Sequence, residues 1–174
     1  MPRRSAAGRK FGSLARGLRL AVFDVDGVLT DGTLYFGPAG EAFKAFNILD
    51  GHGLKLLQAA GLKTAILSGR KSKPVTHRMK ELGVDHVIQG TGDDKMPHFE
   101  RLLKKLGLAE SDCSYMGDDL QDLAVLRRCG LAVAPANAVE AVKKAAHYVT
   151  RASGGRGAVR EFCDMVIAAR GARR

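Results

Sequence analysis

Two kinds of hydrophobic pattern alternate along the chain. Short continuous apolar runs are typical of strands buried on both faces, and they predict strands at residues 20–23, 64–67, 84–88, 113–116, 131–134 and 148–149. Between them, apolar residues recur every three or four positions, which predicts helices at residues 53–60, 73–82, 96–106, 120–129, 137–146 and 158–169. Two alternating runs around Gly37-Pro38-Ala39-Gly40 predict a β-hairpin within residues 32–46.

Regular alternation of strands and helices predicts the fold class, α/β. Parallel strands joined by helical crossovers give a Rossmann-like three-layer α/β/α arrangement, with a central parallel sheet and the hairpin as a small flap. The 174 residues suit one such domain, which we place at residues 18–170. Residues 1–17 are then expected to form a flexible basic N-terminal extension, and residues 171–174 a basic C-terminal tail.

The formal net charge of +10 suggests at first a protein that binds nucleic acid. The excess lies at the two ends, because residues 1–20 hold six basic residues and no acidic one, and residues 170–174 hold three more. Of the 28 Lys and Arg residues, the remaining 19 face all 18 acidic ones, so the body is nearly neutral. This argues against nucleic acid as a partner. A basic nucleic-acid-binding or scaffold protein stays the alternative from another class, and it predicts salt-sensitive binding that disappears with the tails.

The composition also bears on location. No apolar run reaches the roughly 18 residues that span a bilayer, so we expect no membrane partner. The N-terminus lacks the apolar core of a secretory signal, and its composition fits a loose extension or an organelle transit peptide. Cys113, Cys129 and Cys163 lie far apart and outside any C-x-x-C pattern. They predict free thiols in a reducing compartment, here the cytoplasm.

Polar side chains stand where the predicted strands end. Asp24 and Asp118 each follow an apolar strand directly. Ser68 ends a third strand, and Lys95 comes a few residues after a fourth. Asp24 and Asp26, two residues apart in an extended segment, point to the same side. Because the carboxyl ends of parallel strands meet at one edge of the sheet, where α/β proteins bind ligands, the sequence predicts a convergent site.

Four segments resemble, in order, the four motifs of the haloacid-dehalogenase (HAD) superfamily: Asp24-Val25-Asp26-Gly27-Val28-Leu29-Thr30, Leu67-Ser68-Gly69-Arg70, Lys95, and Gly117-Asp118-Asp119-Leu120-Gln121-Asp122. The second aspartate of the first motif favours a phosphatase or mutase within that superfamily. Only about 40 residues separate Asp26 from Ser68, and the hairpin and one helix use them. We therefore expect no cap domain, and a site that is open unless another subunit covers it.

The resemblance implies a metal-dependent phosphoryl transfer at the first and fourth motifs. Asp24 is the expected nucleophile, because a carboxylate can attack phosphorus and split hydrolysis into two easier steps. Asp26 is the expected general acid and base. Mg²⁺ is the expected cofactor, bound by the carboxylates of Asp24 and Asp118 and by the backbone carbonyl of Asp26.

The other motif residues are expected to support this chemistry. Ser68 and Lys95 would hold the oxygens of the transferring phosphoryl group by hydrogen bond and charge. Asp122 falls one helical turn after Asp118 and is expected to orient Lys95 or the metal ligands. Asp119 is expected to share that role, with an N-capping or solvated aspartate as the alternative.

Over about residues 18–170 the chain resembles the capless 3-deoxy-D-manno-octulosonate (KDO) 8-phosphate phosphatases. Besides the first and fourth motifs, the resemblance rests on three stretches, Lys44–Gly53, Ser68–Ser72 and Tyr148–Glu161. It implies hydrolysis of KDO 8-phosphate to KDO and inorganic phosphate through an aspartyl-phosphate, in lipopolysaccharide biosynthesis. The family forms homotetramers in which the hairpins build a central barrel and a neighbouring subunit helps to close each site.

An acidic sugar phosphate carries a carboxylate besides its phosphate, which suits several cations near the site. The resemblance implies substrate contacts from Asn47, Ile48, Leu49, Asp50, Gly51, Lys55, Gly69, Arg70, Arg78 and Lys95. Lys55 stands where the family usually has arginine, and it lacks the bidentate fork. Arg78 also fits a solvated helix face, and Gly154–Gly157 a plain loop before a helix. The alternative substrate is the 9-phosphate of a nonulosonic (sialic-type) acid, since phosphatases of those pathways are similar in fold and motifs.

Overall fold

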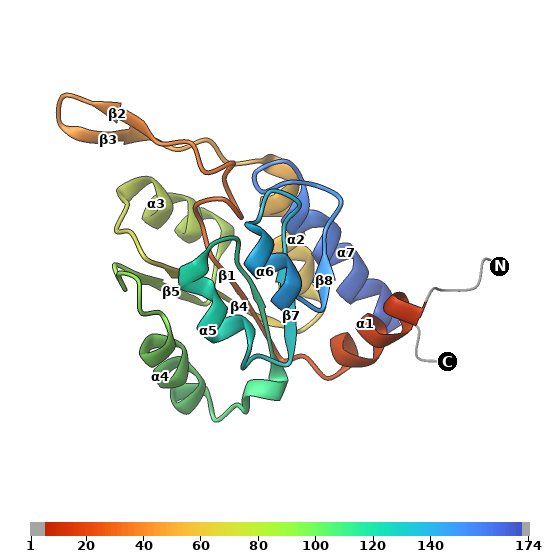
Figure 1. Ribbon diagram of the computed structural model, residues 1–174. Coiled ribbons are helices and arrows are strands. Elements are labelled where there is room, and N and C mark those ends of the chain that lie inside the picture. Colours follow the sequence, from red (N-terminus) through yellow and green to blue (C-terminus); the bar gives the residue numbers. More distant parts are fainter. Residues whose placement is uncertain (1–5, 172–174) are drawn as a thin grey trace.

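Six parallel strands form one sheet at the centre of the molecule (Figure 1). The computed structural model describes residues 6–171, with side chains from residue 11 onward. The strands are β1 Leu20–Phe23, β4 Lys63–Ser68, β5 His86–Gln89, β6 Cys113–Met116, β7 Leu131–Ala134 and β8 Tyr148–Val149. Their order is β5-β4-β1-β6-β7-β8. The chain thus winds outward from β1 in one direction and from β6 in the other, which places the topological switch point between these two strands.

Helices cover both faces of the sheet. They are α1 Ala6–Arg16, α2 Ile48–Ala59, α3 Lys73–Leu82, α4 Met96–Leu106, α5 Leu123–Leu126, α6 Glu140–Ala145 and α7 Ala158–Gly171, with 3₁₀ turns at Glu110–Asp112 and Leu120–Asp122. Alternate residues of β1 face opposite layers. Ala21 and Phe23 pack in the core with α1, α2, α3 and α7, whereas Leu20 and Val22 pack with α4, α5 and α6. The predicted three-layer α/β/α arrangement is confirmed.

Helix α2 begins at Ile48 and not at residue 53, as the periodicity predicted. Asn47 caps the helix, because its Oδ1 accepts a hydrogen bond of 2.8 Å from the Leu49 N–H. Gly51 lies inside the helix, where a Cβ would stand 2.5 Å from Arg78 Nη2. Gly51 therefore permits close packing between α2 and α3.

Two more predicted helices are shorter in the structure. The segment predicted as one helix over residues 120–129 is a 3₁₀ turn followed by the single turn of α5. The helix predicted over residues 137–146 begins only at Glu140, as α6.

The N-terminal segment differs from the prediction of a flexible extension over residues 1–17. Residues 6–16 form α1, and the ring of Phe11 contacts the rings of Tyr148 and Phe162 at centroid distances of 5.3 and 6.3 Å. Phe11, Ala15 and Leu18 are all buried, at the spacing of one helix face. The prediction is therefore wrong for this helix, because its apolar face packs on α7. Residues 1–5 and the tail residues 172–174 lie outside the described part of the chain, and Gly171 ends α7.

The predicted hairpin is a flap that projects from the body (Figure 1). Strands β2 Tyr35–Gly37 and β3 Gly40–Phe43 pair antiparallel, and the rings of Tyr35 and Phe43 stack at 4.5 Å. Between β1 and β4 the chain forms only this flap and α2, so no cap domain is inserted there. Within residues 6–171, no helix has the length and apolar character needed to cross a membrane. The three cysteines are buried free thiols, as predicted.

Candidate active site

The first and fourth motifs meet at the switch point of the sheet. In the parallel pairing of β1 with β6, Phe23 lies opposite Met116, so the carboxyl ends of both strands deliver Asp24 and Asp118 to the same edge. Between them passes Gly27, with a φ of +83°, where a Cβ would stand 2.0 Å from Asp118 Oδ2. Glycine is required here because the Asp24 loop runs directly against the Asp118 carboxylate.

A fully buried lysine joins the carboxylates of this site. Lys95 immediately precedes α4, and its Nζ lies 2.9 Å from Asp24 Oδ2 and 2.7 Å from Asp122 Oδ1. The hydroxyl of Tyr115, on β6, donates to the same Asp122 oxygen at 2.6 Å. Lys95 and Asp24 are only 1% and 2% exposed, so this ion pair is shielded from water and its geometry is fixed.

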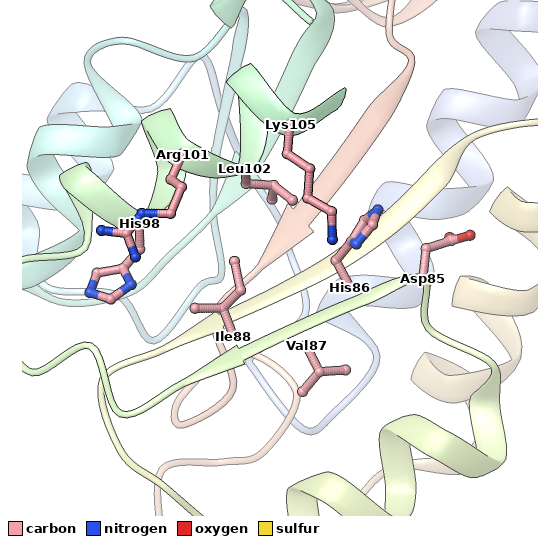
Figure 2. A pocket seen from close by; sticks show the side chains of 8 residues that line it. All are labelled: Asp85, His86, Val87, Ile88, His98, Arg101, Leu102 and Lys105. Atoms are coloured by element: carbon pink, nitrogen blue, oxygen red, sulfur yellow. The ribbon is translucent and has the colours of Figure 1, made fainter. Parts of the chain in front are cut away.

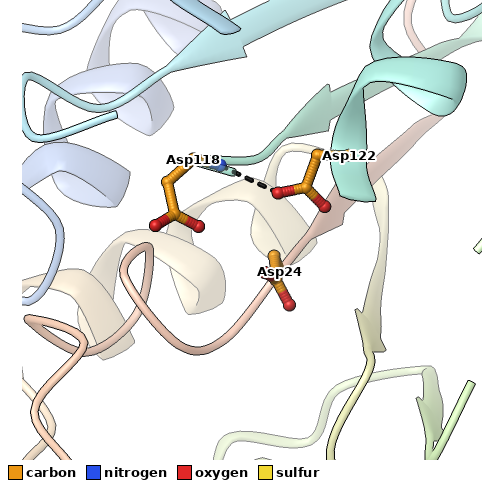
Figure 3. A group of neighbouring side chains, drawn as sticks. All are labelled: Asp24, Asp118 and Asp122. Atoms are coloured by element: carbon orange, nitrogen blue, oxygen red, sulfur yellow. Dashed lines mark hydrogen bonds between the residues drawn. The ribbon is translucent and has the colours of Figure 1, made fainter. Parts of the chain in front are cut away.

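Asp122 holds Lys95 and the turn that carries Asp118 in place through hydrogen bonds. While its Oδ1 accepts from Lys95, its Oδ2 accepts from the backbone N–H groups of Asp118 and Asp119 at 2.9 and 3.1 Å (Figure 3). The carboxylate thereby connects the Lys95 ammonium to the turn that carries Asp118. The Asp119 side chain lies apart from this cluster, because it is exposed and accepts a hydrogen bond from the Leu120 N–H. Asp119 is thus an N-cap, the alternative that the sequence left open.

Burial sets the electrostatics of the cluster. It is the largest of the causes that together raise the pKa of Asp24 to about 7. Among the other causes, the Lys95 ammonium lowers this pKa and the Asp122 carboxylate raises it. Burial also raises the pKa of Asp118 to about 8, and the nearby Asp24 and Asp122 carboxylates add to this. For Lys95, burial opposes the charged form, but the two carboxylates outweigh burial and the pKa lies above its ordinary value. The site therefore holds more negative charge than its one lysine neutralises.

The donor set fits a hard divalent cation. Oxygen atoms of Asp24, Asp118 and Asp122 lie within 4.8 Å of one another (Figure 3). Both oxygens of Asp122 accept protein hydrogen bonds, whereas Asp118 Oδ1 is buried and has no hydrogen-bond partner. A buried carboxylate oxygen without a donor is costly unless a cation binds it. Asp24 and Asp118 are thus the two carboxylates placed to hold a metal.

Asp26 lies beside the cluster and is held by the flap. Its carboxylate pairs with the ammonium of Lys44, a side chain that is 1% exposed. The same ammonium lies 2.9 Å from the carboxylate of Glu41 on β3, and Arg70 lies 3.8 Å from Asp26 and 3.7 Å from Glu41. Glu41 also accepts from the hydroxyl of Ser72. Sequence reasoning missed Glu41 and Lys44 as site residues, although Lys44 stood in a stretch that carried the family resemblance.

Ser68 ends β4, and Gly69 begins the turn that follows it. Ser68 is buried, and its backbone carbonyl accepts from the Thr91 N–H at 3.3 Å. At Gly69 a Cβ would stand 2.9 Å from the carbonyl oxygen of Gly92. The loop that leads to Lys95 therefore packs directly on the turn after β4.

The predicted substrate contacts fall into two groups. Asp50 belongs to the architecture of the fold: it is 1% exposed, and its two oxygens accept from the backbone N–H groups of Gly157 and Arg160 at 3.1 and 2.9 Å. It thereby holds the start of α7, so its carboxylate is not free to meet a substrate. Asn47 likewise caps α2, and it also donates to the carbonyl of Gly155 at 3.3 Å.

The second group lies at the surface near the flap. Ile48 and Leu49 are 78% and 54% exposed. Arg78 lies against Gly51, pairs with Glu81 at 2.8 Å, and leaves its buried Nε without a partner. Lys55 lies only 3.5 Å from a backbone carbonyl, that of Glu81. Together with Arg70 and the exposed flap residues Phe36 and Phe43, these residues on α2 and α3 are called the rim below.

The glycine-rich stretch Gly154–Gly157, before α7, packs against the loop that follows Asp26. A Cβ on Gly154 would stand 1.8 Å from the carbonyl oxygen of Gly27, and the Gly155 N–H donates to the carbonyl of Val28 at 3.0 Å. Asn137 joins the two loops, because it donates to the Gly27 carbonyl and accepts from the Gly154 N–H. The stretch is thus more than a connecting loop, since it braces the segment that carries Asp24 and Asp26.

The fold and this cluster define a haloacid dehalogenase-like hydrolase. The family model described as haloacid dehalogenase-like hydrolase matches residues 88–162. A buried carboxylate at the end of β1, joined to a lysine and a second aspartate at the end of β6, agrees with that class.

Known proteins specify the family further. The chain is 46% identical to 3-deoxy-D-manno-octulosonate 8-phosphate phosphatase KdsC of Escherichia coli K12, over 90% of this chain and 83% of that protein. Crystal structures with TM-scores of 0.91 include a probable YrbI family phosphatase from Pseudomonas syringae, 50% identical over 94% of this chain and 92% of that one. Another is the Moraxella catarrhalis 3-deoxy-D-manno-octulosonate 8-phosphate phosphatase in complex with magnesium, phosphate and KDO, 40% identical over 94% and 93% of the two chains. This chain therefore belongs to the family of 3-deoxy-D-manno-octulosonate 8-phosphate phosphatases, and the resemblance found in the sequence is confirmed.

Proposed function

We propose that this protein is a Mg²⁺-dependent phosphatase that hydrolyses KDO 8-phosphate to KDO and inorganic phosphate, in lipopolysaccharide biosynthesis. The observation that carries the proposal is the buried cluster of Asp24, Lys95 and Asp118 at the switch point of the sheet. The E. coli relative at 46% identity bears the name of this activity. The Moraxella neighbour is in complex with a magnesium ion, a phosphate ion and KDO, which are the metal and the two products of such a reaction.

Asp24 is the nucleophile in this proposal. One of its carboxylate oxygens forms a bond to phosphorus while the bond from phosphorus to the sugar oxygen breaks, and water then hydrolyses the aspartyl-phosphate. Lys95 fixes the orientation of Asp24 through its 2.9 Å contact and presents positive charge to the transferring oxygens. Ser68, at the end of β4, offers a hydroxyl to the same oxygens.

Asp26 acts as the general acid and base. It gives a proton to the leaving sugar oxygen and then accepts one from the attacking water. Lys44 holds its carboxylate from the flap side, and Glu41 holds Lys44. The flap thereby positions the proton-transfer group.

Asp24 and Asp118 would hold Mg²⁺, together with the backbone carbonyl of Asp26. When bound, the ion neutralises the repulsion between the carboxylate cluster and a phosphate dianion. The buried, unpartnered Asp118 Oδ1 is the atom most directly served by such an ion. Asp122 remains occupied by Lys95, Tyr115 and two backbone amides.

We assign recognition of the sugar to the basic residues of the rim. Arg70 lies between Asp26 and Glu41, and Arg78 stands beside the start of α2 with a buried Nε that lacks a partner. These guanidinium groups suit the carboxylate that an acidic sugar carries in addition to its phosphate. Lys55 provides a further charge at that rim.

The rim also supports assembly as a homotetramer, with a neighbouring subunit completing each site. Phe36 and Phe43 on the flap are 64% and 56% exposed, and Ile48 and Leu49 at the start of α2 add a second exposed apolar surface. Contiguous exposed apolar groups of this kind mark association surfaces. The buried free thiols agree with a reducing compartment, and we place the enzyme in the cytoplasm.

Steady-state phosphate release tests the proposal. We expect kcat/KM for KDO 8-phosphate to exceed that for a nonulosonic acid 9-phosphate at least tenfold, and to depend on added Mg²⁺. Equal efficiency on the two substrates would refute the choice of sugar. Asp24→Asn should abolish release, whereas Asp164→Asn, on the outer surface of α7, should leave it unchanged. Full activity of Asp24→Asn would refute the mechanism.

A further inference from the structure

A groove at the outer edge of the sheet has no part in the proposed reaction (Figure 2). It lies between β5 and α4, and its volume is about 340 Å³. Its walls come from Asp85, His86, Val87, Ile88, His98, Arg101, Leu102 and Lys105. This volume is within the range of about 300–1,000 Å³ that is typical of small-molecule sites.

The groove has an apolar floor and basic ends. The α4 residues that line it recur at the spacing of one helix face, and His86 and Ile88 lie on the same side of β5. Figure 2 shows Ile88 and Leu102 in the middle, with Arg101 towards one end and Lys105 next to His86 at the other. This is the shape that receives an apolar body flanked by anionic groups.

The cations of the groove lack protein partners. Among residues 6–171, neither the Arg101 guanidinium nor the Lys105 ammonium forms a hydrogen bond or an ion pair. By contrast, Arg128 on a neighbouring surface pairs with Glu110. His86 Nε2 is buried and has no hydrogen-bond partner. Unpartnered cations beside a buried, unsatisfied nitrogen favour an anion in the space between them.

The charged groups that act on His86 are two lysines and one aspartate. Burial lowers the pKa of His86, and the ammonium groups of Lys105 on α4 and Lys63 on β4 add to this, while Asp85 opposes it. The Asp85 carboxylate is already occupied by the Thr64 N–H and hydroxyl, at 2.8 and 3.1 Å. One oxygen of this carboxylate, which also lines the groove, is therefore held by β4.

We propose that the groove between β5 and α4 binds a small organic anion, with its phosphate-like head between Lys105 and His86 and its apolar body on Ile88 and Leu102. This ligand site is separate from the carboxylate cluster and does not rest on the proposed phosphatase function. Its two walls flank the segment that carries Lys95, because β5 ends at Gln89 and α4 begins at Met96.

Nuclear magnetic resonance of the full chain with ¹⁵N-labelled histidine tests this site. The probe is phenylphosphonate, whose carbon–phosphorus bond the enzyme cannot hydrolyse, in metal-free buffer. We expect saturable shifts of the His86 and His98 signals, weaker shifts with inorganic phosphate and none with benzyl alcohol. Lys105→Gln should weaken binding at least tenfold, and Lys104→Gln, the adjacent exposed lysine outside the groove, by less than twofold.

Three results would overturn the proposal. The first is titration with phenylphosphonate that leaves the His86 and His98 signals unmoved. The second is equal affinity in Lys105→Gln and Lys104→Gln. The third is an equal response to benzyl alcohol, which would show that the groove accepts apolar molecules without regard to charge.

Discussion

The carboxylate cluster and the rim are built in opposite ways. In the cluster, Asp24, Lys95 and Asp122 are buried and bind one another. On the rim, Phe36 and Ile48 are 64% and 78% exposed, and Arg70 lies over the Phe36 ring at 5.9 Å from its centroid. In the function we propose, the buried cluster carries the reaction chemistry within one chain, whereas substrate selection uses surfaces that one chain leaves exposed.

The largest effect should follow from removing the cation of the cluster. Lys95→Met leaves Asp24 and Asp122 buried together without their partner, which should cost about 3–5 kcal/mol of unfolding free energy. Loss of charge stabilisation should also slow phosphate release by about 10²–10³-fold. Urea unfolding and initial rates measure the two effects. Lys104→Met, on the exposed side of α4, is the matched control, and equal behaviour of the two variants would contradict the account.

A second, smaller effect should follow from forcing apart the loops that wall the cluster. Gly154→Ala would place a Cβ 1.8 Å from the Gly27 carbonyl oxygen, and such overpacking costs about 1–3 kcal/mol. Phosphate release should fall as well, because the displaced loop carries Asp26. Gly17→Ala is the control, since its nearest neighbour would be 4.0 Å away. A Gly154→Ala variant with the wild-type melting temperature and rate would show that the loops do not support each other.

The third prediction concerns pH and the metal. Without metal, the pKa values of Asp24 and Asp118 are about 7 and about 8, above the ordinary value of 3.8. The stability that these two groups contribute is therefore full below about pH 4 and is lost as the pH rises through 7 and 8. Bound Mg²⁺ displaces their protons, so a fixed Mg²⁺ concentration should raise the melting temperature more at about pH 8.5 than at about pH 6. Asp118→Asn should reduce this difference, and a Mg²⁺ effect that does not change with pH would exclude these carboxylates as ligands.

The smallest effect on a single chain should come from the rim. Phe36→Ser and Ile48→Ser replace exposed side chains, so the unfolding free energy of the subunit should change by only about 0.5 kcal/mol. Light scattering should nevertheless show loss of the proposed tetramer, and KM should rise because the neighbouring subunit that we propose to complete the site is lost. Val149→Ser, which changes an exposed apolar residue on β8, should preserve the assembly. Wild-type mass and KM in both rim variants would place the association surface elsewhere.

Sequence patterns predicted the half of the site that depends on strand ends. Asp24 and Asp118 follow continuous apolar runs, and parallel strands necessarily deliver such residues to one edge of the sheet. The fold class and the order of the elements followed from the same alternation. These features depend on local sequence and on general rules of topology, so one chain is enough to predict them.

Features that depend on distant partners were not predictable in this way. Asp50 looked like a substrate contact, but it holds backbone amides more than one hundred positions away, at Gly157 and Arg160. Lys44, directly after β3, pairs with Asp26, which lies 18 positions earlier in the chain. Helix α1 is too short to be stable alone and forms because Phe11 packs against Phe162. No local pattern specifies these contacts.

The central claim is that Asp24 accepts the phosphoryl group. Rapid acid quenching of a single turnover with KDO 8-phosphate and Mg²⁺, followed by mass spectrometry of the peptide that contains Asp24, tests it most directly. We predict a transient phosphoryl adduct on Asp24 that forms before inorganic phosphate appears and is absent from Asp24→Asn. Phosphate release without any adduct on Asp24, at an unchanged rate in Asp24→Asn, would contradict the account.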